Sequence, residues 1–287
     1  MNQKPKVAII AATHFLGRGL VEKLYPQYEL RVLGRSFSRL NEAFPQNIEK
    51  KEIDLLQLES IRTTLEGCQI IVNIAHASFT NNILRSLPST AEKVVCIGST
   101  WKYTQYPNER AEQVRQAEES LKRSSVKWVM LHPSMIYGMP EEKTVSRLIN
   151  WINRFPVVAL PWRGRNLVQP VHAKDIIDVL FLAVSSDKMN NQSFILAAHE
   201  PITYYKMIKL CAAKINKRVW VLPVPRIILK IFAKILSFTP YHSKLRSDQV
   251  DRLTEDKNFD VVPIEKVLGR NLLSFSEGLS QTAIGEL

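Results

Sequence analysis

Residues 6–17 have the residue types and spacing of a segment that could bind a phosphate group. Lys6 to Ala11 is a short apolar run rich in isoleucine and valine, and such a run predicts a buried parallel strand. After a tight turn, apolar residues recur at helical spacing from Phe15 onward. The N-terminus of a helix offers free N–H groups and the positive end of its dipole to a pyrophosphate. A strand, a tight turn and a helix in this order are typical of a dinucleotide-binding βαβ unit.

Arg35 is the next candidate for phosphate chemistry, and it follows a predicted strand at residues 29–33. About 20 residues beyond the turn, units that bind NAD carry an acid that holds the ribose 2′-hydroxyl. No Asp or Glu occurs between residues 31 and 41, where Arg35 and Arg39 stand instead. A guanidinium forms charge-assisted, bidentate bonds with a phosphate. We therefore expect NADP as the cofactor, with NAD less favoured; the alternative is a surface arginine at a strand end.

The rest of the chain supplies the elements that must position these residues. Apolar runs predict further strands at residues 48–53, 69–74, 92–97, 126–131 and 192–197, and helical spacing predicts helices at residues 56–65, 108–123, 144–154 and 203–215. Strands that alternate with helices are typical of an α/β fold with a parallel sheet. In such a sheet, ligands bind at the carboxyl ends of the strands.

Three stretches resemble the extended and atypical short-chain dehydrogenase/reductase superfamily. Residues 11–17 are similar to its GATGFLG turn, residues 132–138 to its RP..IYG segment, and residues 167–175 to its R.LVHV.D segment. The whole chain resembles the NAD-dependent epimerase/dehydratase group, and more narrowly bacterial proteins related to the accessory Rossmann subunit of respiratory complex I and to NmrA-type proteins. The resemblance implies a Rossmann-like, doubly wound parallel sheet with a small mixed C-terminal substrate lobe.

The turn at residues 11–17 departs from the superfamily's glycine pattern. Gly17 is kept, and it would let helix and strand pack closely. Ala11 stands at the first glycine position, where it costs little if its φ stays negative. His14 replaces the glycine that normally lets the pyrophosphate touch the backbone, so either its side chain turns away or the phosphates shift. The cofactor site is then either retained or weakened and empty.

The resemblance also implies a set of cofactor-binding positions. They are Ala11, Thr13, His14, Phe15, Leu16, Gly17, Arg35, Asp54, Leu55, Ala75, His76, His132, Pro133 and Met135. Asp54 would contact the adenine, and residues 73–76 would pass the ribose. His132 and Pro133 would line the nicotinamide end. His76 is equally well explained as a plain loop histidine.

Ser99 and Thr100 begin the predicted catalytic site. They match the superfamily position whose hydroxyl polarises a substrate carbonyl. The superfamily's Tyr-x-x-x-Lys pair should follow on the helix at residues 108–123, where the lysine would lower the pKa of the acid/base tyrosine. That helix contains no tyrosine, and it contains no lysine before Lys122. The usual dyad is therefore absent.

The loop at residues 101–106, WKYTQY, offers substitutes for the missing pair. Lys102, Tyr103 and Tyr106 could each donate a proton. Alternatively, the aromatic side chains only pack the loop down. We take Lys102 and Tyr103, together with Ser99 and Thr100, as the candidate catalytic residues.

Charge narrows the possible partners. The chain has 287 residues and a formal net charge of +12, and between Pro201 and Ser247 there are ten Lys or Arg residues but no Asp or Glu. This excess fits a solvated basic face, a small anionic substrate or an anionic membrane surface. No nucleic-acid-binding module is visible, so no nucleic-acid partner is expected. Residues 226–238 predict a basic amphipathic helix that either packs on the domain or lies in a membrane interface.

Cysteine usage and hydropathy bound the location. Cys68, Cys96 and Cys211 lie far apart and form no metal or redox spacing, so they read as buried free thiols in a reducing compartment. No apolar run reaches the roughly 18 residues that a membrane span needs. We expect a cytoplasmic protein, either free or peripheral at the inner face of a membrane, and no metal site.

Two functions fit these features. The first is an NAD(P)(H)-binding oxidoreductase or epimerase, with NADP preferred, that acts on an anionic substrate such as a nucleotide sugar. The second is a non-catalytic NADP-binding sensor or a membrane-associated subunit with a protein partner. In either case residues 1–160 would form the NAD(P)-binding core, residues 167–198 would return to it, and residues 199–287 would form a basic C-terminal lobe.

Overall fold

The computed structural model describes residues 4–25, 27–106, 108–140, 142, 144–229 and 251–282. In chain order the elements are β1 (Lys6–Ile10), α1 (Phe15–Leu24), β2 (Glu29–Gly34), α2 (Phe37–Ala43), β3 (Glu49–Glu52), α3 (Leu58–Leu65), β4 (Ile70–Asn73), η1 (Ala77–Phe79), α4 (Thr80–Arg85), β5 (Lys93–Ile97), η2 (Thr100–Tyr103), α5 (Glu109–Lys122), β6 (Lys127–Pro133), β7 (Ile136–Tyr137), α6 (Val145–Arg154), β8 (Val157–Leu160), η3 (Pro161–Gly164), β9 (Leu167–Val168), β10 (Val171–His172), α7 (Ala173–Ser185), η4 (Asp187–Met189), β11 (Gln192–Leu196), β12 (Ile202–Thr203), α8 (Tyr204–Lys214), β13 (Trp220–Pro223), α11 (Val262–Leu268) and α12 (Phe275–Gln281).

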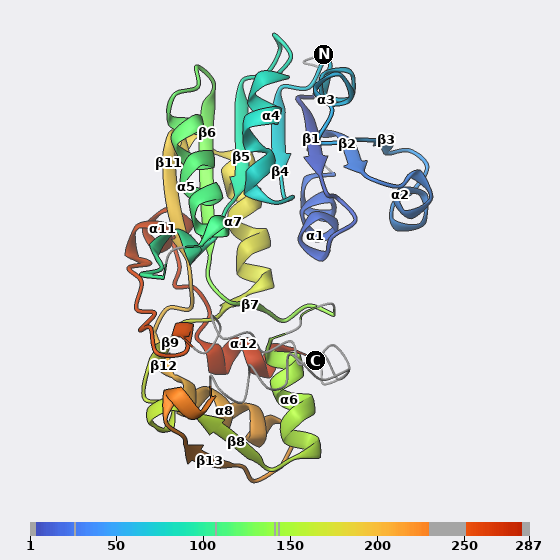
Figure 1. The fold of residues 1–287 in the computed structure, drawn as a ribbon. Helices are drawn as coiled ribbons and strands as arrows, with labels where there is room; N and C mark the ends of the chain where they lie inside the picture. The colour runs from blue at the N-terminus through green and yellow to red at the C-terminus, as the bar shows by residue number, and fades with distance from the viewer. Residues whose placement is uncertain are drawn as a thin grey trace.

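A seven-stranded sheet forms the centre of the fold, with the strand order β11-β6-β5-β4-β1-β2-β3. Every neighbouring pair in it is parallel. The order reverses between β1 and β4, and helices cover both faces of the sheet (Figure 1). This confirms the predicted α/β class with a Rossmann-like, doubly wound parallel sheet.

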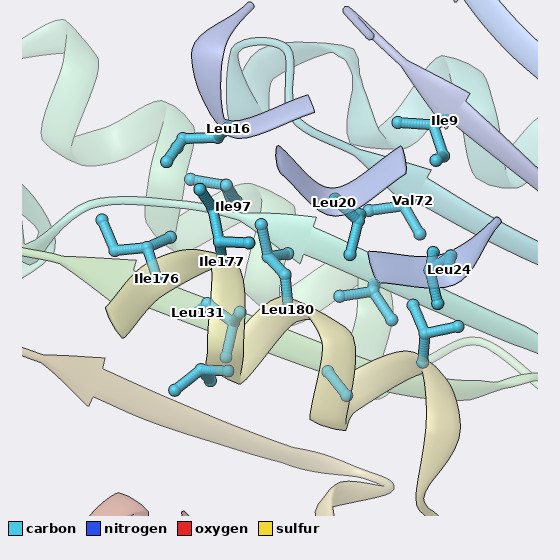
Figure 2. Packing of buried hydrophobic residues seen from close by; sticks show 14 of the residues in the cluster. Ile9, Leu16, Leu20, Leu24, Val72, Ile97, Leu131, Ile176, Ile177 and Leu180 are labelled. Carbon is cyan, nitrogen blue, oxygen red and sulfur yellow. The ribbon is translucent and has the colours of Figure 1, made fainter. Parts of the chain in front are cut away.

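Helices α1 and α7 pack side by side on one face of the sheet (Figure 2). Leu16, Leu20 and Leu24 recur every fourth residue of α1 and are buried, because this spacing places them on one side of the helix. They meet α7 and sheet residues in one cluster, which includes Ile9, Val72, Ile97, Leu131, Ile176, Ile177 and Leu180. On the opposite face α3, α4 and α5 form a second cluster with the sheet. The two clusters hold the strand ends in place.

Gly17 allows α1 to approach the turn that follows β1. A Cβ atom at this position would lie 2.5 Å from the carbonyl oxygen of Ala12 and 2.7 Å from its Cα. Both are backbone atoms, so no rotamer change can relieve the clash. The predicted close packing of helix and strand at Gly17 is confirmed.

A smaller lobe lies below the sheet in Figure 1 and contains α6, β8, α8, β13 and α12. Its own core includes Tyr137, Ile149, Met207 and Phe275. Residues 145–160, which the sequence assigned to the cofactor-binding core, pack in this lobe with α8 and β13. The predicted helix at residues 226–238 lies largely outside the described residues.

The predicted burial of the cysteines is confirmed. Cys68, Cys96 and Cys211 are all buried and free, and burial raises the pKa of both Cys96 and Cys211 to about 12. Within the described ranges, no helix is both long and apolar enough to cross a bilayer.

Candidate functional site

A cleft of about 1410 Å³ opens at the carboxyl ends of β1, β2, β3 and β4, and we refer to it as the β1–β4 cleft. It lies where the strand order reverses, which is the usual ligand position in a doubly wound sheet. Eight of the residues predicted to bind a cofactor line it: Ala11, Thr13, His14, Arg35, Asp54, Leu55, Ala75 and His76. The cleft is not lined by Phe15, Leu16 or Gly17, because the side of α1 that carries them packs into the core.

The turn after β1 holds Ala11 in the left-handed region, with a φ of 61°. The N–H of His14 donates to the carbonyl of Ala11 at 3.0 Å, and the N–H of Ala12 donates to the carbonyl of Leu33 at 3.1 Å. These two hydrogen bonds fix the turn. The condition under which alanine would cost little here, a negative φ, is therefore not met.

We expect Ala11→Gly to raise the free energy of unfolding by about 0.5–1 kcal/mol. Glycine relieves a left-handed penalty of roughly 1–2 kcal/mol, and the greater freedom of the unfolded chain offsets about 0.4–1 kcal/mol of that gain. Denaturant titration measures the change. Ala12→Gly is the matched control, because Ala12 is buried without a positive φ, and it should lose about 1 kcal/mol. A loss of stability in both variants would contradict this account of the turn.

His14 caps the N-terminus of α1. Its backbone is extended, with a φ of −66° and a ψ of 150°, and its Nδ1 accepts a hydrogen bond from the N–H of Leu16 at 3.4 Å. The imidazole thus does not turn away from the helix end. A phosphate that binds this N–H has to displace the ring.

Three arginines line the β1–β4 cleft: Arg18, Arg35 and Arg39. All three are exposed. The Nε of Arg18 donates to the carbonyl of Thr13 at 3.0 Å, whereas Arg35 and Arg39 form no ion pair with any described residue. Glu52, on the same wall, accepts a hydrogen bond from the N–H of Phe37 at 2.7 Å. Arg18 was not among the predicted cofactor-binding residues, although a cation near the N-terminus of a helix, where the dipole disfavours it, is a usable signal.

The opposite wall of the cleft is held by short-range hydrogen bonds. The carboxylate of Asp54 accepts from the N–H of Leu56 at 2.9 Å. The N–H of Ala75 donates to the side chain of Asn73 at 3.0 Å. His76 caps η1 by accepting from the N–H of Ser78 at 3.3 Å, as a loop histidine does, and it still lines the cleft.

Ser99 and Thr100 lie at the end of β5, outside the residues that line the β1–β4 cleft. The hydroxyl of Ser99 accepts a hydrogen bond from the N–H of Trp101 at 3.2 Å and so caps η2. Thr100 is buried. Both residues follow the carboxyl end of β5, as the sequence predicts.

A buried carboxylate, Glu118 on α5, binds the loop after Ser99 to the sheet. It forms an ion pair with Lys102, it lies 2.9 Å from Nε2 of His132, and it accepts from the hydroxyl of Ser193 at 3.2 Å. Glu118 was not among the predicted site residues. The available signal was its position on the buried stripe of α5 that includes Val114, because a buried carboxylate needs a partner.

His132 does not reach the wall of the β1–β4 cleft, because its side chain is fully buried beside Glu118. Burial lowers the pKa of His132. Burial alone would raise the pKa of Glu118, but the hydrogen bonds from His132 and Lys102 and the charge of Lys102 outweigh it and lower that pKa. The cluster thus holds an ionised Glu118, a charged Lys102 and a neutral His132 that donates through Nε2.

Pro133 and Met135 lie between the sheet and the smaller lobe. Pro133 is buried and pairs with Leu196 at the end of β11. Met135 packs against the core of the smaller lobe. Neither residue lines the β1–β4 cleft.

The loop at residues 101–106 is tied to the C-terminal segment. The hydroxyl of Tyr106 lies 3.4 Å from that of Thr254, and the N–H of Gln105 donates to Glu255 at 2.7 Å. Tyr103 differs, because its side chain is 44% exposed and its hydroxyl bonds to no described residue. The Nζ of Lys102 lies 5.0 Å from the centre of its ring. Of the two tyrosine hydroxyls, that of Tyr103 is therefore the one that could donate a proton to a substrate.

Known proteins resemble this chain in sequence over part of its length. No protein-family model matches the chain. A UDP-glucose 4-epimerase from Vibrio cholerae is 25% identical over 182 residues, which are 62% of this chain and 52% of that protein. The chain thus matches about half the length of this curated relative.

Solved structures match along almost the whole chain. Citrobacter triphenylmethane reductase, in complex with NADP(H), has a TM-score of 0.77 and 14% identity, with 97% of this chain and 100% of that one covered. Thermus thermophilus UDP-glucose 4-epimerase, in complex with NAD, has a TM-score of 0.71 and 17% identity, with 98% of each chain covered. The chain has the Rossmann-like fold of these NAD(P)-binding epimerases and reductases. This fold hosts reductases as well as epimerases, so the site must decide between activities.

Proposed function

We propose that the chain is an NADP(H)-binding oxidoreductase or epimerase. The observation that carries the proposal is the group of three arginines in the β1–β4 cleft, of which Arg35 follows β2 and Arg39 lies on α2. A ribose 2′-phosphate at this wall would meet guanidinium groups, whereas NAD would present only a hydroxyl to them. The complexes of the structural relatives support a nicotinamide dinucleotide of either kind.

The chain's residues fit a dinucleotide, with one local conflict. The cleft has ample volume, and its arginines and Asp54 suit a phosphate and an adenine. The conflict is the His14 imidazole, which would have to leave the Leu16 N–H before a pyrophosphate could bind it. We therefore expect affinity that depends strongly on the 2′-phosphate.

Binding of four dinucleotides, NADPH, NADP, NADH and NAD, tests this proposal. By calorimetric titration we expect NADPH to bind about 100-fold more tightly than NADH, since each charge-assisted bond contributes about 1.5–3 kcal/mol. The double variant Arg35→Ala with Arg39→Ala should lower the affinity for NADPH to that for NADH and leave NADH unchanged. Arg62→Ala is the control, because Arg62 is an exposed arginine of α3 outside the cleft. Equal affinities for NADPH and NADH in the unmodified protein would contradict the 2′-phosphate assignment.

The catalytic part of the proposal rests on the end of β5. The reduced cofactor would supply a hydride to a carbonyl carbon, Ser99 or Thr100 would polarise the carbonyl oxygen, and Tyr103 would give that oxygen its proton. Lys102 is paired with Glu118, so it would position the loop and Tyr103 rather than donate the proton. The substrate we infer is small and anionic, such as a nucleotide sugar, and the basic lobe and the epimerase relative support this class.

A second candidate is a non-catalytic NADP-binding sensor or partner subunit. It is favoured by α5, which contains no tyrosine and no lysine before Lys122, and by the His14 cap. Steady oxidation of NADPH with a carbonyl substrate separates the two. Tight NADPH binding without oxidation by any nucleotide sugar or other carbonyl compound would favour the sensor.

A further inference from the structure

The smaller lobe carries an exposed aromatic patch that no core contact explains. We define the patch as Trp151, Phe155, Val157, Trp220 and Leu222, whose exposed fractions are 52%, 43%, 37%, 72% and 47%. Trp220 and Leu222 flank the buried Val221, and Trp151 precedes the buried Ile152, whereas Phe155 and Val157 lie in an exposed run at residues 153–157.

Specific contacts make the patch continuous. Strands β8 and β13 pair in parallel, and Val157 stands opposite Trp220. The indole N–H of Trp151 donates to the carbonyl of Val157 at 2.9 Å, and the rings of Trp151 and Phe155 lie 4.8 Å apart. Contiguous exposed apolar patches mark binding surfaces more often than singly scattered surface hydrophobic residues do.

The sequence segments that supply the patch carry basic residues and no acidic ones, although Arg226 pairs with Asp251. No Asp or Glu occurs in residues 143–174 or in residues 201–229, which supply α6, β8, α8 and β13. The basic residues of these stretches are Lys143, Arg147, Arg154, Arg163, Arg165, Lys174, Lys206, Lys209, Lys214, Lys217, Arg218 and Arg226. The guanidinium of Arg154 lies 5.3 Å from the centre of the Phe155 ring, and Arg218 stands two residues before Trp220.

We propose that this patch docks the protein on an anionic phospholipid bilayer. Tryptophan is enriched at the membrane–water interface, aliphatic side chains such as Leu222 reach the acyl boundary, and lysine and arginine are attracted to anionic headgroups. A second copy of the chain would bring the same positive charge to the patch, so the charge disfavours self-association. In Figure 1, β8 and β13 lie at the end of the molecule away from β1, β2 and β3, so docking leaves the β1–β4 cleft open.

Vesicle binding tests the proposal with the full chain. Vesicles of phosphatidylcholine alone are compared with vesicles that contain phosphatidylcholine and phosphatidylglycerol, by flotation and by tryptophan emission. We expect binding to the anionic vesicles only, with a blue shift of the emission as Trp151 and Trp220 enter the interface. Absence of binding to anionic vesicles would overturn the proposal, and so would equal binding to neutral vesicles.

Two double variants locate the binding surface. Trp220→Ser with Leu222→Ser should reduce the partition coefficient at least about tenfold, because exposed apolar area no longer enters the membrane. Arg154→Ser with Arg218→Ser should reduce it about 25-fold, because each basic residue near an anionic surface contributes roughly fivefold. Phe37→Ser, which removes an aromatic residue that is 48% exposed on α2, should leave it unchanged.

Three results would overturn the assignment to the patch. The first is unchanged vesicle binding by both double variants when circular dichroism shows them folded. The second is a dimer of the unmodified protein that becomes a monomer in Trp220→Ser with Leu222→Ser, since the patch would then be a self-interface. The third is binding to an acidic protein or to heparin that is as strong as vesicle binding and requires Trp220.

Discussion

Glu118→Ala is expected to lower the free energy of unfolding by about 3–5 kcal/mol, because it leaves the charge of Lys102 uncompensated at a site where only 19% of that side chain is exposed. It also removes the acceptor of Nε2 of His132 and of the Ser193 hydroxyl. Chemical denaturation measures the loss. Glu119→Ala is the matched control, since Glu119 is the next residue of α5 and is half exposed beside Lys122; it should cost less than about 1 kcal/mol. Equal losses in the two variants would show that the buried cluster does not stabilise the fold.

The pH dependence of stability provides a readout that simple loss of packing would not change. The pKa of His132 is lowered from its ordinary 6.5 in the folded chain, so below pH 6.5 the unfolded chain takes up a proton that the folded chain does not. Stability should then fall by up to about 1.4 kcal/mol per pH unit from this group. The lowered pKa of Glu118 adds a further loss below its ordinary value of 4.5. His132→Asn should flatten the first part of this dependence; an unchanged slope between pH 6.5 and 5 would exclude His132 as its source.

Gly17→Ala is expected to cost about 3 kcal/mol or more and to abolish dinucleotide binding. The added Cβ would lie 2.5 Å from the carbonyl oxygen of Ala12, and overpacking against a backbone that cannot rotate away is at the upper end of such costs. Helix α1 would have to move away from β1, and the N-terminus of the helix would move with it. Thermal unfolding and NADPH titration of the same variant measure the two effects.

Gly19→Ala is the control for this substitution, because it lies on the same helix. A Cβ there would meet the tip of the Ile177 side chain at 2.5 Å, and that tip can rotate. Together with the better helix propensity of alanine, this should keep the cost below about 1 kcal/mol. A cost for Gly19→Ala as large as that of Gly17→Ala would contradict the distinction between backbone and side-chain clashes.

The sequence alone determined most of the elements and the place of the candidate site. The predicted strand at residues 126–131 corresponds to β6 (Lys127–Pro133), and the predicted helix at residues 108–123 corresponds to α5 (Glu109–Lys122). Such elements follow from the local spacing of apolar residues, which sets which face each element buries. The cleft at the strand ends follows from the parallel sheet. Short α4 (Thr80–Arg85) was not predicted, because its six residues carry too few turns for a helical pattern.

Only the tertiary structure decided how the individual side chains are used. Lys102 and His132 both bind Glu118, because η2, β6 and α5 converge at that point. Ala11 adopts a positive φ because hydrogen bonds to its own turn and to β2 fix it. The patch on β8 and β13 joins Val157 to Trp220, and no local pattern relates them. These outcomes depend on contacts between residues distant in sequence, whereas helix and strand periodicity depends only on neighbours along the chain.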